Sequence, residues 1–267
     1  MSIFNIASYR FISLGQSQLC DLQEKLRPFC KTLDLKGSVM LSREGINFML
    51  AGEENAVRQF QVFLEKIPFF KSLVYKESLS DAVPFKRLFI KIKKQLTPFT
   101  QEVQMTTYPA NYISPTQLKA WLDEEKEFVL LDVRNQYEIE QGGFKKSISL
   151  NIKHFKDFTV AIEQLPKKMK SQVIVSCCTG GIRCEKVVPW MQQEGFKEVY
   201  QLEGGILQYF KECGDVHYQG DCYVFDERMV VKPSNYLRRN ANSSERAWVR
   251  QGEMKNFEKK RSVYQNT

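Results

Sequence analysis

The segment that most constrains the fold is residues 172–186, where a short apolar run meets a glycine-containing loop and a helix start. Residues 173–176 read as a buried strand, and the loop 177–183 has the sequence Cys-Cys-Thr-Gly-Gly-Ile-Arg. Glycines let the backbone curl so that successive N–H groups point inward, and the following helix adds its positive end. A strand, a tight loop and a helix in this order predict a parallel α/β sheet, with functional residues at the carboxyl ends of its strands.

The segments on either side of this loop support the same architecture. Residues 128–134 and 198–202 are apolar runs of strand length, and helical patterns lie between the runs. Ser114 precedes Pro115, which predicts an N-cap and first helical position there. A helix is expected over 184–193, with a kink at its internal proline. Short apolar strands that alternate with helices predict a parallel sheet.

The first hundred residues have a different pattern. Strands are expected at 3–11, 36–42, 48–52, 72–78 and 88–93, helices at 17–33 and 53–67, and a hairpin turn at 43–47. The order β-α-β-β-α-β is typical of a ferredoxin-like domain. We therefore expect a domain at 1–95, a linker at 96–113, a parallel-sheet domain at 114–215 and a basic extension at 216–267. In the extension, residues 223–225 and 229–231 are expected to form a small hairpin, with irregular or partly helical structure beyond Pro233.

The composition bounds the class of protein. A chain of 267 residues is long enough for two domains, and 43% of it is apolar. No apolar run approaches the ~20 residues that cross a bilayer, and the start resembles no secretory signal. We therefore expect a cytoplasmic protein without a membrane partner.

The charge is unevenly distributed along the chain. Residues 1–100 carry 15 lysines and arginines against 9 acidic residues, and residues 225–267 carry 10 against 5. The middle, 101–224, carries 14 against 17. Basic flanks suit a polyanion such as RNA, although solubility alone would also explain them.

The seven cysteines are odd in number and irregularly spaced, which argues against a disulfide framework. With no Cys-x-x-Cys pair and only two histidines, a structural metal site is not expected. Cys20, Cys30 and Cys213 are interpreted as ordinary buried thiols. Cys177 is expected to point into the core.

Three motifs in the middle segment resemble a rhodanese domain. They are Leu131-Asp132-Val133-Arg134 with Tyr137-Glu138, the loop from Cys178 to Arg183, and Leu202-Glu203-Gly204-Gly205-Ile206 with Tyr209. Together with Arg43-Glu44-Gly45-Ile46-Asn47 and residues 220–228, they resemble the tRNA uridine hydroxylase family. The resemblance implies a ferredoxin-like (acylphosphatase-like) domain followed by a rhodanese domain. It also implies oxygen-dependent formation of 5-hydroxyuridine at the wobble position of tRNA. The chain departs from the family pattern at Phe48-Met49, at Gly143 and in a tail without cysteine after Cys222.

Cys178 is the expected nucleophile, ionised and reachable by solvent, because a loop of inward N–H groups lowers a thiol pKa. Its sulfur would carry a sulfane sulfur as a persulfide or react with a substrate carbon. Arg183 would favour the anion, and Gly180, Gly181 and Ile182 would complete the anion-binding loop. Thr179 would donate its hydroxyl to the sulfur. Cys184 is either a resolving thiol for Cys178 or a side chain packed beneath the loop.

Five further residues have a supporting or binding role in this hypothesis. Asp132 and Arg134 end a strand and either support the site or only hold the architecture. Arg43, Glu44 and Asn47 are expected at a hairpin tip, where they face the Cys178 loop or the RNA, or simply form a turn.

The leading hypothesis is a tRNA hydroxylase whose basic flanks bind the anticodon arm, with molecular oxygen as co-substrate by family resemblance and no other cofactor evident. The alternatives are a sulfurtransferase, served by a sulfur donor protein, and a non-catalytic RNA-binding or redox-sensing protein. Six residues from Cys178 to Arg183 make a pocket for one sulfur or another small group, whereas Cys-based phosphatases use a loop that is one residue longer. A phosphatase is therefore disfavoured.

Overall fold

The computed structural model describes residues 2–236. The sequence hypotheses for residues 1 and 237–267 lie outside this part of the chain. The described residues begin in a strand and end in the 3-10 helix Pro233–Tyr236. None of the helices among residues 2–236 has the length and apolar character needed to cross a membrane.

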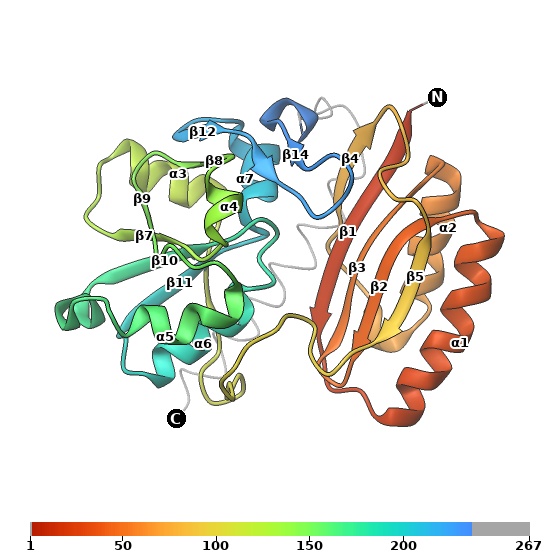
Figure 1. Cartoon of the computed structure of the whole chain (residues 1–267), viewed down its shortest axis with the longest axis horizontal. Coiled ribbons are helices and arrows are strands. Elements are labelled where there is room, and N and C mark those ends of the chain that lie inside the picture. Colours follow the sequence, from red (N-terminus) through yellow and green to blue (C-terminus); the bar gives the residue numbers. More distant parts are fainter. Residues whose placement is uncertain (1, 237–267) are drawn as a thin grey trace, which may run out of the picture. The chain divides into compact units, whose positions relative to one another are not determined.

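The N-terminal region is a five-stranded sheet with two long helices (Figure 1). Its elements are β1 (Ile3–Phe11), α1 (Gln16–Thr32), β2 (Lys36–Ser42), β3 (Gly45–Gly52), α2 (Glu54–Glu65), a 3-10 turn (Pro68–Phe70), β4 (Lys76–Ser80) and β5 (Leu88–Ile92). The strand order is β4-β1-β3-β2-β5. The first four strands pair antiparallel, and β5 adds to β2 in parallel. This is the expected ferredoxin-like arrangement with one extra edge strand.

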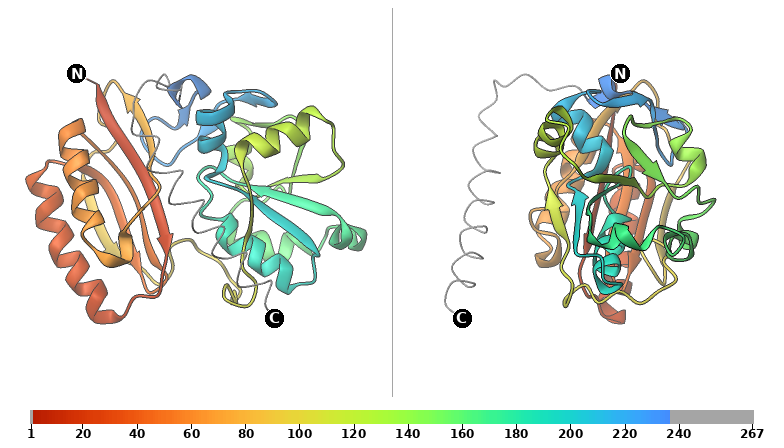
Figure 2. Two further views of the ribbon diagram at one scale, coloured as in Figure 1. Left: turned by 180° about the vertical axis from the view of Figure 1, so that it is seen from behind. Right: turned by 90° about the vertical axis from the view of Figure 1, so that its left-hand side faces the viewer.

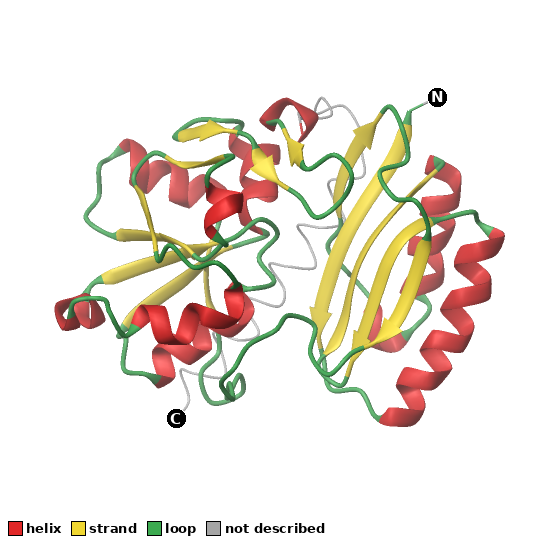
Figure 3. Ribbon diagram, in the orientation of Figure 1, coloured by secondary structure: helices red, strands yellow, loops and turns green. Residues whose placement is uncertain are grey.

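Alternating side chains give this sheet two different faces. Phe4, Ile6, Val39, Ile46 and Phe48 are buried in one core with apolar side chains of α1 and α2. Both helices lie on that one face of the sheet (Figure 3). Because successive residues of a strand point to opposite sides, the intervening residues form a face that no helix of this domain covers.

The second region is built on a parallel sheet. Its elements are β6 (Asn111–Ile113), α3 (Pro115–Asp123), β7 (Val129–Asp132), α4 (Gln136–Ile139), β8 (Gly142–Phe144), β9 (Ser147–Ser149), a 3-10 turn (Phe155–Asp157), α5 (Phe158–Ile162), a 3-10 turn (Lys167–Ser171), β10 (Val173–Cys177), α6 (Cys184–Gln193), β11 (Glu198–Leu202) and α7 (Gly205–Cys213). The order β6-β11-β10-β7-β9 is parallel throughout. The predicted parallel sheet is confirmed.

Helices cover both faces of this sheet (Figure 2). Leu118 of α3 and Ile206 of α7 share one core with Leu130 and Val175. Residues of α5 and α6 form a second core with Leu131 on the opposite face. The expected N-cap is also present, since the Ser114 side chain accepts a hydrogen bond from the Gln117 N–H.

Short hairpin strands follow α7. The strand β12 (Tyr218–Gly220) pairs with β8, and β13 (Cys222–Tyr223) pairs with β14 (Val230–Val231) around the expected turn. The hairpin at the start of the C-terminal extension is therefore confirmed.

Some local predictions were wrong. Strand β3 already begins at Gly45, so Asn47 lies within a strand and not at the hairpin tip. Strand β4 begins at Lys76 and not at Ser72, which has a φ of 57°, in a region that strands do not adopt. Cys20 is exposed on the solvent side of α1, next to the buried Leu19. Strand β6 lies within the segment expected to have few regular features.

Candidate functional site

The site lies where strands β7 and β10 end side by side. Cys177 at the end of β10 is directly opposite Asp132 at the end of β7. The loop from Cys178 to Arg183 therefore begins next to the Asp132-Val133-Arg134 segment, as the sequence predicted. The N–H of Val133 also donates to the Cys177 carbonyl at 3.0 Å, which extends the pairing beyond the strands.

The Cys178 thiol is surrounded by donors of its own loop. The Gly181 N–H donates to its Sγ at 3.1 Å. Burial raises the pKa of Cys178, but a hydrogen bond with Cys184, the positive charge of Arg183 and the N–H groups of Arg183 and Cys184 outweigh it and lower the pKa to about 5. A thiol with this pKa is a thiolate at neutral pH, and a thiolate is the nucleophilic form.

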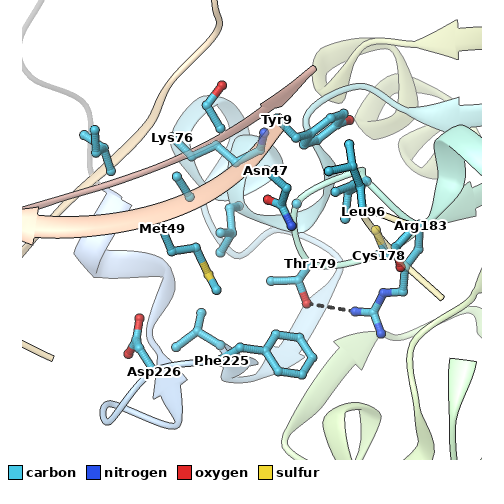
Figure 4. A pocket seen from close by; sticks show the side chains of 18 of the residues that line it. Tyr9, Asn47, Met49, Lys76, Leu96, Cys178, Thr179, Arg183, Phe225 and Asp226 are labelled. Atoms are coloured by element: carbon cyan, nitrogen blue, oxygen red, sulfur yellow. Dashed lines mark hydrogen bonds between the residues drawn. The ribbon is translucent and has the colours of Figure 1, made fainter. Parts of the chain in front are cut away.

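Cys178 has no exposed surface, so the expectation that it is directly reachable by solvent is wrong. It instead forms part of the wall of a cavity of about 610 Å³ (Figure 4). Thr179, Gly180, Ile182 and Arg183 line the same cavity. Access to the sulfur is therefore from the cavity and not from the outer surface.

Arg183 is held in place by Glu138, which the sequence analysis named only as part of a rhodanese-like motif. Its guanidinium donates two hydrogen bonds to the Glu138 carboxylate, at 2.6 and 2.7 Å. Although burial lowers the pKa of Arg183, the hydrogen bonds and charge of Glu138 raise it well above its usual range. Arg183 is thus a permanent cation beside the Cys178 loop.

Close packing and backbone conformation shape the loop. Gly181 has a φ of 95°, a conformation that favours glycine. A Cβ on Gly205, at the start of α7, would lie 2.5 Å from the Cys178 carbonyl oxygen and 2.7 Å from the Gly181 nitrogen. The Thr179 hydroxyl donates to the Tyr223 carbonyl at 3.4 Å and accepts from Arg183 at 3.5 Å. The expected donation from Thr179 to the Cys178 sulfur is absent from these contacts.

The neighbouring cysteines are all buried free thiols. Burial and the adjacent Cys178 raise the pKa of Cys184 well above its usual range. Cys184, at the start of α6, is therefore a neutral thiol that is buried in the same core as Cys178. Cys177 points into the core, as expected.

Asp132 and Arg134 form a buried ion pair at the end of β7. The shortest distance, between Arg134 Nη2 and Asp132 Oδ2, is 2.6 Å, and neither side chain is exposed. Arg134 also donates to the Gly142 carbonyl at 2.7 Å. These contacts hold the strand end against β8, which is an architectural role.

Residues of the N-terminal sheet line the opposite side of the cavity. They include Asn5, Ala7, Tyr9, Asn47, Met49, Lys76 and Ser78 from β1, β3 and β4. Burial lowers the pKa of Lys76 to about 8, although the charges of Cys178 and Glu185 oppose this shift. The Tyr9 hydroxyl donates to Glu185 Oε1 at 2.9 Å. Sequence reasoning missed Tyr9, Lys76 and Glu185, because only strand pairing and chain packing bring them to the loop.

The three residues of the expected hairpin tip have different environments. Asn47 lines the cavity. Glu44 accepts a hydrogen bond from the buried Lys186 of α6 at 2.7 Å and another from the Leu96 N–H at 2.8 Å. Arg43 is exposed, and its carbonyl accepts from the Leu14 N–H at 3.1 Å.

No cluster of three or more metal-ligating side chains occurs within residues 2–236. The chemistry that the arrangement offers is that of an ionised thiol, fixed donors around it and the ammonium of Lys76 across the cavity. Within the same residues, the Lys76 ammonium makes no hydrogen bond or ion pair, and it lies 5.0 Å from the centre of the Tyr9 ring.

Comparison with known proteins agrees with both domains. Residues 3–96 match the UPF0176 acylphosphatase like domain, and residues 114–212 match the Rhodanese-like domain. A protein from Variovorax paradoxus is 41% identical over 251 residues, which cover 92% of this chain and 94% of that protein. One from Cupriavidus pinatubonensis is 40% identical over 240 residues, covering 88% and 84%. Both are named tRNA uridine(34) hydroxylase.

Among solved structures, the Alr3790 protein from Anabaena matches with a TM-score of 0.34 and 24% identity, over 40% of this chain and 91% of that one.

The fold and the loop define a rhodanese-domain protein that carries an acylphosphatase-like N-terminal domain. Within that class, the sequence identity of 40% and 41% to these relatives, over most of both chains, shows the family. The chain belongs to the tRNA uridine(34) hydroxylase family.

Proposed function

We propose that this protein hydroxylates C5 of the wobble uridine of tRNA, using Cys178 as its reactive group. The observation that carries the proposal is a thiolate, with a pKa of about 5, in the wall of a cavity of about 610 Å³. Ligand cavities of roughly 300–1,000 Å³ accept molecules of nucleotide size. Relatives that match most of this chain are named tRNA uridine(34) hydroxylase, which supports the proposal.

The residues across the cavity suit a uracil base. The Asn47 amide offers both a donor and an acceptor, which matches the N3–H and a carbonyl oxygen of uracil. The Lys76 ammonium can donate to a second carbonyl oxygen or to the phosphate. Met49 and Phe225 offer apolar surface to the faces of the ring. In this proposal Arg183 keeps Cys178 ionised, and Gly181 directs its N–H at the sulfur.

The remaining parts of the proposal follow from charge and family resemblance. The basic N-terminal domain and tail would bind the anticodon arm, since lysines and arginines exceed acidic residues in both. One atom of molecular oxygen would become the 5-hydroxyl oxygen, and a two-electron reductant would reduce the other atom to water. The protein would act in the cytoplasm.

The test is nucleoside mass spectrometry of tRNA from a strain without the gene, complemented with different variants. The wild-type chain should restore nucleosides derived from 5-hydroxyuridine, and Cys178→Ser should not. Cys20→Ser, which alters an exposed thiol on α1, is the matched control and should restore them. Unchanged nucleosides in the deletion strain would refute the proposal.

The same loop also supports a second activity, transfer of sulfane sulfur from a donor protein or thiosulfate. The Gly181 N–H at 3.1 Å from Cys178 Sγ lies where it would stabilise a terminal persulfide sulfur. A gain of one sulfur atom on Cys178 and turnover without RNA, together with unchanged tRNA nucleosides, would establish this alternative and exclude the first.

A further inference from the structure

The helix-free face of the N-terminal sheet carries side chains that the catalytic proposal does not use. On the other face, α1 and α2 pack against the sheet core (Figure 1). On the helix-free face, Tyr9, Asn47, Met49 and Lys76 line the Cys178 cavity (Figure 4). The same face continues over β2 and β5, away from these residues.

The strand register makes this face continuous. Lys76 is opposite Ala7, Ala7 is opposite Met49, Met49 is opposite Ser38, and Ser38 is opposite Phe89. This row crosses all five strands. Neighbouring strands are about 4.8 Å apart, so Phe89 lies about 10 Å from Met49 along the row. One end of the row is therefore in the cavity, and the other is at the sheet edge.

A second row lies beside the first. Tyr9 is opposite Asn47, Asn47 is opposite Met40, and Met40 is opposite Lys91. Neither row contains an acidic residue. The two rows therefore add no carboxylate of their own between the cavity and β5, and the nearest one contacting them is Glu185, which accepts a hydrogen bond from Tyr9 at the cavity end.

The β5 end of this face combines an aromatic ring with two cations. The Arg87 guanidinium carbon lies 4.7 Å from the centre of the Phe89 ring, and the Lys91 Nζ lies 5.0 Å from it. Phe89 is half-buried, whereas Arg87 and Lys91 are exposed. Aromatic rings on an open sheet stack with unpaired bases, and adjacent cations bind the phosphates.

We propose that this face binds the single-stranded nucleotides next to the target uridine, with one base on Phe89 and phosphates at Arg87 and Lys91. The proposal rests on the proposed function, since it takes the cavity as the site of the target base. Charge complementarity selects RNA as the occupant. Residues 238–267 carry 8 lysines and arginines against 3 acidic residues, so the chain's own tail has the wrong sign for this face.

The first test measures binding of the full chain to an unmodified tRNA transcript and to its anticodon stem-loop. The double variant Arg87→Glu/Lys91→Glu should raise Kd at least tenfold and lower the slope of log Kd against log salt by about two, one for each phosphate contact. Lys25→Glu/Lys31→Glu makes the same change of charge on exposed residues of α1 and is the control. An equal loss of tRNA affinity in the two double variants would show that RNA is attracted by overall charge and not by this face, which would overturn the proposal.

Phe89→Leu tests the stacking directly, because leucine keeps apolar bulk on the sheet but cannot stack on a base. It should weaken binding of the stem-loop by about tenfold without altering the salt slope. Unchanged affinity would overturn the proposal. In Phe89→Trp, RNA should change the fluorescence that the new tryptophan adds to that of the three tryptophans of the wild type. If iodide fails to quench that tryptophan in the RNA-free protein, the chain itself covers the face, and the proposal is wrong.

Failure of this inference and failure of the proposed function give different results. If Cys178→Ser abolishes 5-hydroxyuridine but the β5 variants bind tRNA like wild type, the helix-free face does not bind RNA and the proposed function stands. If the β5 variants lose RNA binding as expected but the deletion strain has unchanged nucleosides, the helix-free face binds RNA and the protein does not hydroxylate the wobble uridine.

Discussion

The guanidinium of Arg183 and the carboxylate of Glu138 form a two-pronged ion pair, at 2.6 and 2.7 Å, between residues 45 positions apart. Neither side chain is more than 7% exposed. Glu138 also accepts from the Asn135 N–H at 3.1 Å, which joins the pair to the first turn of α4. The pair therefore fixes a positive charge beside Cys178 from outside the loop.

Arg183→Gln should raise the pKa of Cys178, because it removes a positive charge that favours the thiolate. It should also lower the free energy of unfolding by about 3–5 kcal/mol, since Glu138 remains buried without its partner. The double variant Arg183→Gln/Glu138→Gln should regain much of that stability but not the low pKa. Urea unfolding and thiolate absorbance at about 240 nm measure the two effects. Equal pKa values in wild type and Arg183→Gln would contradict this account.

The Cys178 thiol should titrate near pH 5 in the folded protein. Because a free thiol has a pKa of about 8.5, the folded state favours the thiolate. The resulting stabilisation is complete above about pH 8.5 and is lost as the pH falls towards 5. The difference in unfolding free energy between wild type and Cys178→Ser, measured from pH 5 to 9, should follow this course. A difference independent of pH would show that Cys178 is protonated.

Local patterns made both domains predictable from the sequence. The alternation of strand residues, the helical period of Leu19, Leu22 and Leu26, and the N-cap at Ser114 are features of neighbouring residues. The Cys178 loop was also predictable, because its glycines and the helix start follow one another in the chain. Asn47 was misplaced because Gly45, with a φ of 131°, begins β3 and does not continue the turn.

The contacts that could not be predicted depend on strand pairing between segments far apart in the sequence. Glu138 approaches Arg183 only because β7 and β10 are adjacent. Lys76 reaches the cavity through the pairing of β4 with β1. A three-residue strand such as β6 has too little pattern to be distinguished from a linker, and its pairing with β11 decides its conformation.

Lys76→Met should weaken tRNA binding about tenfold at pH 7, because it removes an ammonium in the cavity that has no carboxylate partner within residues 2–236. The pKa of Lys76 is lowered to about 8, so the wild type should lose affinity between pH 7 and 9 as the charge disappears. In Lys76→Met this loss should be absent. Lys71→Met, at an exposed position nearby, is the control and should bind like wild type. If Lys76→Met loses tRNA affinity between pH 7 and 9 as Lys71→Met does, a group other than Lys76 causes the pH dependence.

Variants of Glu44 and Arg43 should distinguish a structural role from a contact with RNA. Lys186 is 3% exposed, and Glu44 is the carboxylate that pairs with it at 2.7 Å. Glu44→Ala should therefore lower the free energy of unfolding by about 1.5–3 kcal/mol, the usual range for a hydrogen bond to a charged group. Its tRNA affinity at a temperature where it is folded should be unchanged. Arg43→Ala, at an exposed position, should leave stability unchanged. Weaker tRNA binding by Glu44→Ala than by Arg43→Ala would reverse these assignments.

Gly205 controls the loop from outside it, and a comparison with Gly195 isolates this effect. Both glycines have positive φ, 69° and 87°, so alanine at either position costs about 1–2 kcal/mol of backbone strain. A Cβ at Gly195 meets nothing within 4 Å, whereas one at Gly205 lies within 3 Å of the backbone of Cys178, Thr179 and Gly181.

Gly195→Ala should therefore lower stability only by the strain and leave the pKa of Cys178 unchanged. Gly205→Ala should lower the free energy of unfolding by more than the strain, because the Cys178 loop must move away from α7. It should also raise the pKa of Cys178, because the Gly181 N–H then no longer donates to the sulfur. Thiolate absorbance of the two purified variants between pH 4 and 9 distinguishes them. If both titrate like wild type, the contact between α7 and the loop does not hold the Gly181 N–H on the thiolate.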